Sequence, residues 1–162
     1  GVSGRVYSMI AEEMSSPQNR GRILWVLASS RPDLIEVDLK RPGRVDVKIP
    51  LFPTANARES FDLIEFLCRS RGITFPATTL DLLAPMLPDW LTAGAAEALA
   101  VKVYRETKTR KCAPVDALVS SLEDYRAPVP REILAFQIQL AISEASDQSF
   151  VPNDFMLKEI AR

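Results

Sequence analysis

The chain has 162 residues, of which 47% are hydrophobic and 25% charged, a composition typical of soluble globular proteins with one compact core or two small ones. Its 20 basic and 21 acidic residues are spread along the sequence and give a net charge of −1, so bulk charge does not indicate a nucleic acid or an anionic membrane as partner. The absence of histidine excludes catalytic triads and dyads that depend on an imidazole.

The first third of the chain predicts part of an α/β fold. Apolar residues recur at helical spacing over 5–14, and a polar, proline-containing run then ends that helix. The continuous apolar run 23–28 is typical of a strand buried on both faces in the middle of a parallel sheet. After a short helical stretch near 36–40, residues 45–49 alternate apolar and polar side chains, as expected of a half-buried or edge strand.

The remainder predicts a helical bundle. Paired prolines in the segment 50–53 resist both helix and strand and mark a domain boundary. We expect Thr54 to cap the first helix of the bundle, which carries an apolar stripe and stops at Gly72. Further helices are expected at about 77–87, 92–111, 114–125 and 131–144, with a short final helix after 152–153.

Cysteine usage and hydropathy predict a cytoplasmic protein. Cys68 and Cys112 lie far apart, each inside a helical pattern and without metal-ligand spacing, so we expect buried thiols in a reducing compartment and no metal site. No apolar run approaches the roughly 20 residues that span a bilayer, and the N-terminus lacks the order of a signal peptide. The chain starts at Gly1 without an initiator methionine, which suits an internal fragment or a tag remnant.

The segment 29–46, directly after the apolar run, is the most informative part of the sequence. Loops at the carboxyl ends of parallel strands are where α/β proteins place ligands. Here Arg41 and Arg44 flank a Pro-Gly turn whose stiffness fixes the direction of the two guanidinium groups, which suits an anion clamp. The alternative is a turn with two solvated arginines in surface ion pairs.

The order of these features resembles the second region of homology of the AAA+ ATPases, in which an apolar strand is followed by TNRPD, a helix and RPGR, an apolar residue and aspartate. The match is close over about 22–50, and the later helices resemble the family's C-terminal lid more loosely. The resemblance implies that Arg41 and Arg44 are arginine fingers that reach the γ-phosphate bound by a neighbouring subunit. A planar, permanently charged guanidinium stabilises the charge that develops in phosphoryl transfer.

Two positions depart from the family pattern. Ser30 stands where the family has an asparagine that orients the attacking water, and a hydroxyl offers one donor where an amide offers two. Looser positioning of water, slow hydrolysis or a divergent branch of the family would follow; alternatively, Ser30 only caps the following turn. Gly94 and Ala95 match the lid segment that lies against adenine and ribose, although the acidic residue is displaced by one position; a small-residue patch for helix packing is the alternative.

The sequence contains no GxxxxGK[ST] loop to hold the phosphates and no apolar strand ending in paired acids to hold Mg²⁺. We therefore expect this chain alone to be inactive, with ATP and Mg²⁺ bound mainly by a preceding part of the parent protein.

The sequence thus predicts residues 1–52 as the second part of an α/β nucleotide-binding domain and 53–162 as the helical lid with a C-terminal extension. The resemblance implies an ATP hydrolase that works as a ring of identical modules, expected to be a hexamer, and remodels a macromolecule, most plainly a protein. An alternative is a degenerate relative that binds nucleotide or assembles without turnover. A helical interaction domain in which the motif is coincidental is the third.

Overall fold

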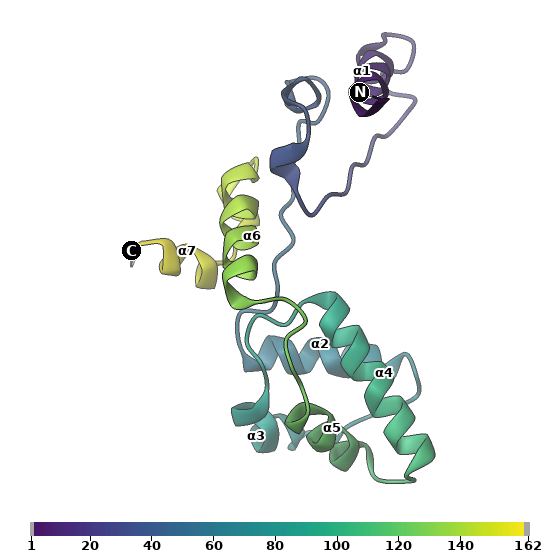
Figure 1. Cartoon of the computed structure of the whole chain (residues 1–162), viewed down its shortest axis with the longest axis vertical. Coiled ribbons are helices and arrows are strands. Elements are labelled where there is room, and N and C mark those ends of the chain that lie inside the picture. The colour runs from purple at the N-terminus through teal and green to yellow at the C-terminus, as the bar shows by residue number, and fades with distance from the viewer. Residues whose placement is uncertain (1, 161–162) are drawn as a thin grey trace. The chain divides into compact units, whose positions relative to one another are not determined.

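The structure is a computed structural model that describes residues 2–160, with side chains described for 4–156. The described part of the chain is mostly helical and contains no β-strand (Figure 1). The α-helices are α1 (Val2–Ser15), α2 (Ala57–Arg69), α3 (Thr79–Leu83), α4 (Ala93–Thr109), α5 (Pro114–Glu123), α6 (Arg131–Glu144) and α7 (Asn153–Ile160). Short 3₁₀-helices lie at Pro32–Leu34, Val37–Lys40, Ala84–Met86 and Gln148–Phe150. Among the described residues, no helix is long and apolar enough to cross a membrane.

The chain divides into two compact units, which are described separately. The motif unit comprises residues 2–51 together with 135–160, and the helical unit comprises Phe52–Leu134. Helix α6 begins in the helical unit and continues in the motif unit.

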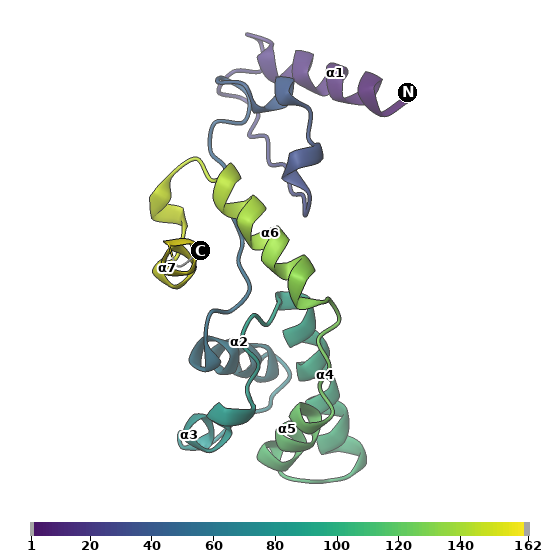
Figure 2. The same ribbon diagram turned by 60° about the vertical axis from the view of Figure 1, so that its left-hand side comes forward.

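The helical unit is built on α2, α4 and α5, of which α4 packs against both of the others (Figure 2). Helix α2 places Phe61, Ile64 and Cys68 at helical spacing on its buried face, as the sequence predicts. The helix ends before Gly72, whose φ of +74° is the left-handed conformation that glycine adopts without a Cβ clash. The fully buried side chains of the core include Ile64, Cys68, Leu83, Leu91, Ala96, Ala100, Val103 and Leu118.

The N-cap of α2 is Asn56, and the prediction of Thr54 in this role is wrong. The Asn56 side chain accepts a hydrogen bond from the Glu59 backbone N–H, while the Glu59 carboxylate accepts one from the Ala55 N–H at 2.7 Å. These reciprocal bonds satisfy donors that a helix start leaves free. Thr54 lies two residues earlier, and its buried hydroxyl oxygen accepts from the Leu91 N–H instead of from the start of the helix.

Thr54 instead joins the segment before α2 to the segment before α4. Its backbone N–H donates to the Leu91 carbonyl at 3.0 Å, and its hydroxyl oxygen accepts from the Leu91 N–H at 2.9 Å. The Ser60 hydroxyl donates to the Pro88 carbonyl, so Thr54 must be the donor in the 2.7 Å bond between the two hydroxyls. This buried network fixes where α4 begins, one residue after its N-cap Thr92.

The motif unit has its own small core. Leu39 has no exposed surface and contacts the buried Ala11 and Met14 of α1, with Ile35 and Val45 packed around them. Elsewhere in this unit, Ile138 on α6, Phe155 on α7 and Val151 in the segment before α7 are also buried. The segment that carries the motif is therefore anchored through Leu39, between its first 3₁₀-helix and the Pro-Gly turn.

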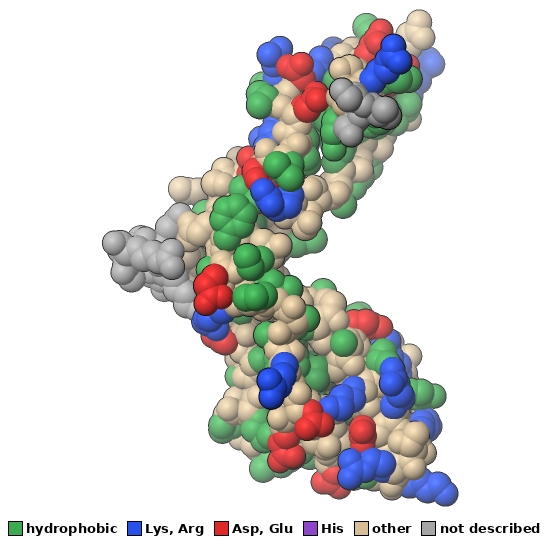
Figure 3. Space-filling model, in the orientation of Figure 1, with side chains coloured by type: hydrophobic (Ala, Val, Ile, Leu, Met, Phe, Trp, Pro, Cys, Tyr) green, Lys and Arg blue, Asp and Glu red, His purple; other side chains and the backbone are tan. Residues whose placement is uncertain are grey.

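The predicted buried strand over 23–28 is not formed. The segment has no regular secondary structure, and its apolar side chains are exposed, with Leu24 at 89% and Val26 at 81%. Hydrophobic side chains are accordingly visible on the surface of the motif unit (Figure 3). A strand exists only where neighbouring backbone pairs with it, and the described residues provide no paired strand for this segment.

The predicted edge strand over 45–49 is also absent as a strand. Val47 and Ile49 are exposed, and the backbone of Lys48 instead pairs with Ser146, just after α6. The alternating pattern is present in the sequence, but it acquires strand geometry only when another strand lies beside it.

Both cysteines are free thiols. The expectation of a buried thiol inside a helix is confirmed for Cys68 and wrong for Cys112, which lies between α4 and α5. Cys68 is buried, and burial raises the pKa of its thiol to about 11, partly opposed by the charge of Arg71. The thiol is therefore protonated at neutral pH and acts as a small core side chain. Cys112 is partly buried against the same core.

Candidate functional site

The two candidate arginines lie on one hydrogen-bonded turn. The Arg44 backbone N–H donates to the Arg41 carbonyl at 3.2 Å, and Gly43 in the turn has a φ of +86°. The Asp46 carboxylate accepts a hydrogen bond from the Gly43 N–H at 2.6 Å. Glycine and aspartate thus have separate roles in the turn: one supplies the left-handed conformation and the other closes the turn.

Both guanidinium groups are held by the same neighbouring residue. Arg41 forms an ion pair with the Asp38 carboxylate at 3.1 Å, and its side chain is 68% exposed. Arg44 donates to the Asp38 carbonyl at 2.6 Å and to the Ser15 hydroxyl at 2.7 Å. Arg41 is therefore the more accessible cation, whereas Arg44 is directed by two hydrogen bonds.

The turn takes its position from the core beneath it. Asp38 immediately precedes Leu39, whose side chain is completely buried against α1. Ser15, the other partner of Arg44, is the last residue of α1. The same helix therefore packs against Leu39 and binds Arg44, so that a hydrophobic contact and a hydrogen bond together locate the turn.

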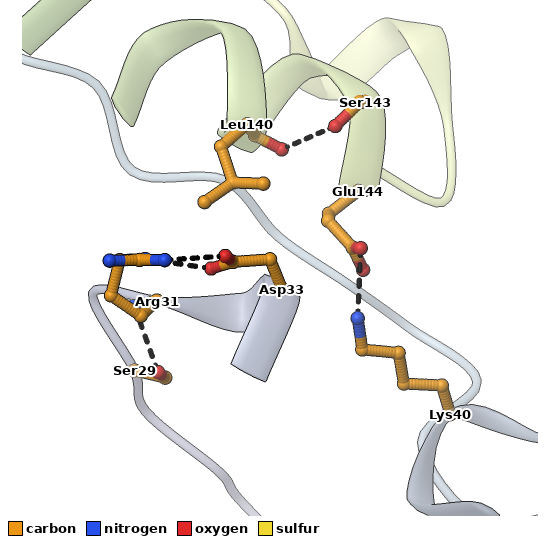
Figure 4. Close-up of polar contacts among 7 residues, drawn as sticks. All are labelled: Ser29, Arg31, Asp33, Lys40, Leu140, Ser143 and Glu144. Carbon is orange, nitrogen blue, oxygen red and sulfur yellow. Dashed lines mark hydrogen bonds and ion pairs between the residues drawn. The ribbon is translucent and has the colours of Figure 1, made fainter. Parts of the chain in front are cut away.

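Ser30 is exposed at the bend between the apolar run and the first 3₁₀-helix. The hydroxyl that accepts from the backbone in this bend belongs to Ser29, which binds the Arg31 N–H at 3.0 Å (Figure 4). Arg31 in turn donates two hydrogen bonds to Asp33, at 2.9 and 2.7 Å. This hydrogen bonding from Arg31 lowers the pKa of the Asp33 carboxyl. Ser29 therefore makes the capping hydrogen bond that was the alternative role for Ser30.

Gly94 and Ala95 lie on the first turn of α4, in the helical unit. Ala95 is buried in the core, and its N–H donates to the hydroxyl of the N-cap Thr92 at 3.2 Å. Gly94 is exposed, and a Cβ at this position would meet no atom within 4 Å. Packing within the described chain therefore accounts for the small size of Ala95, but not for that of Gly94.

The structure brings Arg41 and Arg44 together, and it places Gly94 and Ala95 in the other unit. Residues that sequence reasoning missed are Asp38 and Ser15, which bind the arginines, and Glu144, which pairs with Lys40 at 2.8 Å. Asp46 lies within the quoted motif, so its position in the sequence could have suggested its role. Nothing in the local sequence signals the contact between Lys40 and Glu144, which are separated by 104 positions.

The described side chains include no group of three or more cysteine, aspartate or glutamate residues placed to hold a metal ion. The chemistry that this chain itself can supply is that of guanidinium groups and hydrogen-bonding hydroxyls.

The known proteins to which this chain is similar are named as ATPases. The chain is 30% identical to the peroxisomal ATPase PEX6 of Penicillium chrysogenum over 126 residues, which are 75% of this chain and 9% of that protein. It is 28% identical to PEX6 of Neurospora crassa over 82% of this chain and 10% of that protein. Over 43% of the chain it is 33% identical to the ribosome biogenesis ATPase RIX7 of Saccharomyces cerevisiae, of which it covers 8%.

The chain thus spans about a tenth of the length of these curated relatives. No family model matches the sequence. No solved structure matches it either.

Proposed function

Because this chain belongs to the AAA ATPase family, as its similarity to PEX6 and RIX7 shows, we propose that it supplies arginine fingers and a sensor segment to an ATP hydrolase. The full-length protein would couple hydrolysis to remodelling of a macromolecule, and we propose that this substrate is a protein. The observation that carries the proposal is the turn that presents Arg41 and Arg44 together, both held by Asp38.

The arginines suit this role because phosphoryl transfer spreads negative charge over the phosphate oxygens. A guanidinium stabilises that charge without transferring a proton, and it does so best when its position is fixed in advance. Arg41 is exposed and forms only an exposed ion pair with Asp38, whereas Arg44 is fixed by two hydrogen bonds. Such a turn can present its charges to a site on another subunit, which requires that the protein assemble.

We propose that Gly94 and Ala95 lie along the adenine and ribose of ATP. The free space around Gly94 supports this assignment, because its lack of a side chain serves no contact within the described chain. ATP and Mg²⁺ would be held mainly by residues outside this chain, because the sequence contains no GxxxxGK[ST] loop to hold the phosphates.

We propose that residues 1–52 are the second part of the nucleotide-binding domain, and that 53–162 are the helical lid with a C-terminal extension. The exposed apolar segment 23–28 supports the first assignment, since such a run would be stabilised by strands on either side in a complete sheet. The extension would begin within α6, whose later residues belong to the motif unit.

The partners would be further copies of the same module in a ring, which we propose to be a hexamer, together with a protein substrate in the cytoplasm. Fingers acting in trans require that subunits assemble, and a ring gives every subunit a neighbour. The even spread of charge gives no indication of a nucleic acid partner.

A degenerate relative that binds nucleotide without turnover is the second candidate, and Ser30 is the observation that favours it. We expect Ser30→Asn to raise phosphate release by the full-length protein by about fivefold, because one added hydrogen bond to the attacking water contributes about 1 kcal/mol. Release is measured at saturating ATP, with Ser29→Asn as a control at the neighbouring position. An unchanged rate would show that residue 30 does not orient water.

The proposal as a whole is tested by ATP turnover of the full-length protein, followed by coupled detection of phosphate. Turnover that depends on Arg41 or Arg44 supports the ATPase; nucleotide binding with no turnover in either the native protein or the Ser30→Asn variant supports the binding module.

A further inference from the structure

The segment that carries the two arginines is held at one end by the last residue of α6 and at the other by a residue just after that helix. We call residues 41–47 the arginine loop; it is flanked by Lys40 and Lys48. The Lys40 ammonium pairs with the Glu144 carboxylate at 2.8 Å (Figure 4), and these side chains are only 18% and 24% exposed. A pair so largely withdrawn from water is screened less by salt than the exposed pairs of this chain.

The second attachment lies on the other side of the loop. The Ser146 backbone N–H donates to the Lys48 carbonyl at 3.2 Å, and the Ser146 hydroxyl accepts from the Lys48 N–H at 3.0 Å. Residues 144–146 therefore contact both residues that flank the arginine loop.

The same helix reaches the earlier part of the motif. The Arg31 guanidinium lies 5.6 Å from the centre of the Phe136 ring, within the range of a cation–π contact. Arg31 is also bound by both oxygens of Asp33, which fixes the plane of its guanidinium. Phe136 and Glu144 lie two turns apart on α6, so the helix contacts the motif at two separated points.

Contacts made by the loop itself are fewer. The turn is closed by Asp46 and Gly43, and Arg44 binds Ser15 and the Asp38 carbonyl, but Arg41, Pro42 and Asp46 are exposed. Val45 is the apolar side chain of the loop that packs, partly buried, against the Leu39 core. The position of Arg41, on the other side of the turn, depends more on the flank next to it, which is Lys40.

We propose that Glu144 is a positioning residue for the arginine fingers, acting through Lys40. The inference rests on the proposed function, since it concerns how well Arg41 and Arg44 are aimed at a phosphate. A group that must meet developing charge has to be held to within about half an ångström, and a misplacement of about 1 Å can reduce a rate by about 100-fold. Glu144 touches no reacting atom; it fixes the start of the loop that does.

The test uses the full-length protein and three variants. Glu144→Lys places two like charges together at Lys40. We expect kcat for ATP to fall about tenfold, because the arginine loop loses its position. KM for ATP should stay unchanged, because the groups that bind the nucleotide are not altered. The charge-reversed double variant Lys40→Glu/Glu144→Lys restores the attraction and should regain most of the loss. Ser143→Lys adds the same charge at the adjacent, exposed position, whose hydroxyl bonds only within α6, and should match the native rate.

The outcomes separate the inference from its premise. An inactive native protein removes the premise and with it the inference. A native protein that loses activity on Arg44→Ala but keeps it on Glu144→Lys overturns the inference alone. So does a loss that appears in KM for ATP, or one that the double variant does not recover.

If Glu144→Lys unfolds, Glu144→Gln replaces it in the same assay, because it keeps the size of the side chain and removes only the charge. The expected fall in kcat is then about threefold, since the remaining hydrogen bond is not charge-assisted on the acceptor side. An unchanged kcat for this folded variant overturns the inference.

Discussion

Arg44→Ala in the full-length protein should lower phosphate release by about 1,000-fold or more, the range that a missing arginine finger produces. In the structure Arg44 is directed by Ser15 and the Asp38 carbonyl, so alanine removes both the charge and the group that holds the turn toward α1. Nucleotide binding should persist, because the loss falls on the transition state. The measurement is single-turnover phosphate release beside equilibrium binding of ADP.

Arg58→Ala is the matched control for that variant. Arg58 lies on α2, is 74% exposed and forms a surface ion pair with Asp62 at 3.8 Å. The Arg58→Ala variant therefore loses the same kind of side chain as Arg44→Ala, but from an exposed ion pair. Its activity should equal that of the native protein. Native-like release by Arg44→Ala, in a protein shown to be folded by circular dichroism, would contradict the assignment of Arg44 as a finger.

Leu118→Ala should lower the free energy of unfolding of the helical unit by about 2–5 kcal/mol. Leu118 lies on α5, has no exposed surface and belongs to the core that α4 and α5 share with α2. Alanine removes three carbon atoms and leaves a cavity that neighbouring helices fill only partly. Urea denaturation followed by Trp90 fluorescence in a Trp25→Phe background reports this unit, because Trp90 belongs to it.

Leu82→Ala serves as the control for the core substitution. Leu82 is 65% exposed on α3, so the same truncation should change stability by less than about 0.5 kcal/mol. Equal effects of the two variants would contradict the packing of α5 in this core.

The helices could be predicted from the sequence because their signals are local. The apolar stripe of α2 and the glycine after it lie within a few residues of each other, and both appear in the structure as expected. The N-cap of α2 was misassigned although its signal was present: Asn56 precedes Glu59 by three positions, the spacing of a capping box. Thr54, the residue expected there, instead forms hydrogen bonds with Leu91, just before α4.

The strands could not be decided in the same way, because a strand is defined by residues that are distant in sequence or in another segment. The run 23–28 has the composition of a buried strand, yet its side chains are exposed, since no strand among the described residues pairs with it. The candidate site shows the same division. The turn of Arg41 and Arg44 could be predicted from adjacent residues, whereas the contact of Glu144 with Lys40 depends on how α6 folds back within the motif unit.

The most direct test of the account is phosphate release by the full-length protein over a range of protein concentrations. Fingers acting in trans complete a site only on assembly, so specific activity should rise with concentration and level off once rings are formed, and Arg44→Ala should remove this rise. Nucleotide binding without phosphate release at any concentration would contradict the ATPase and favour an inactive binding module.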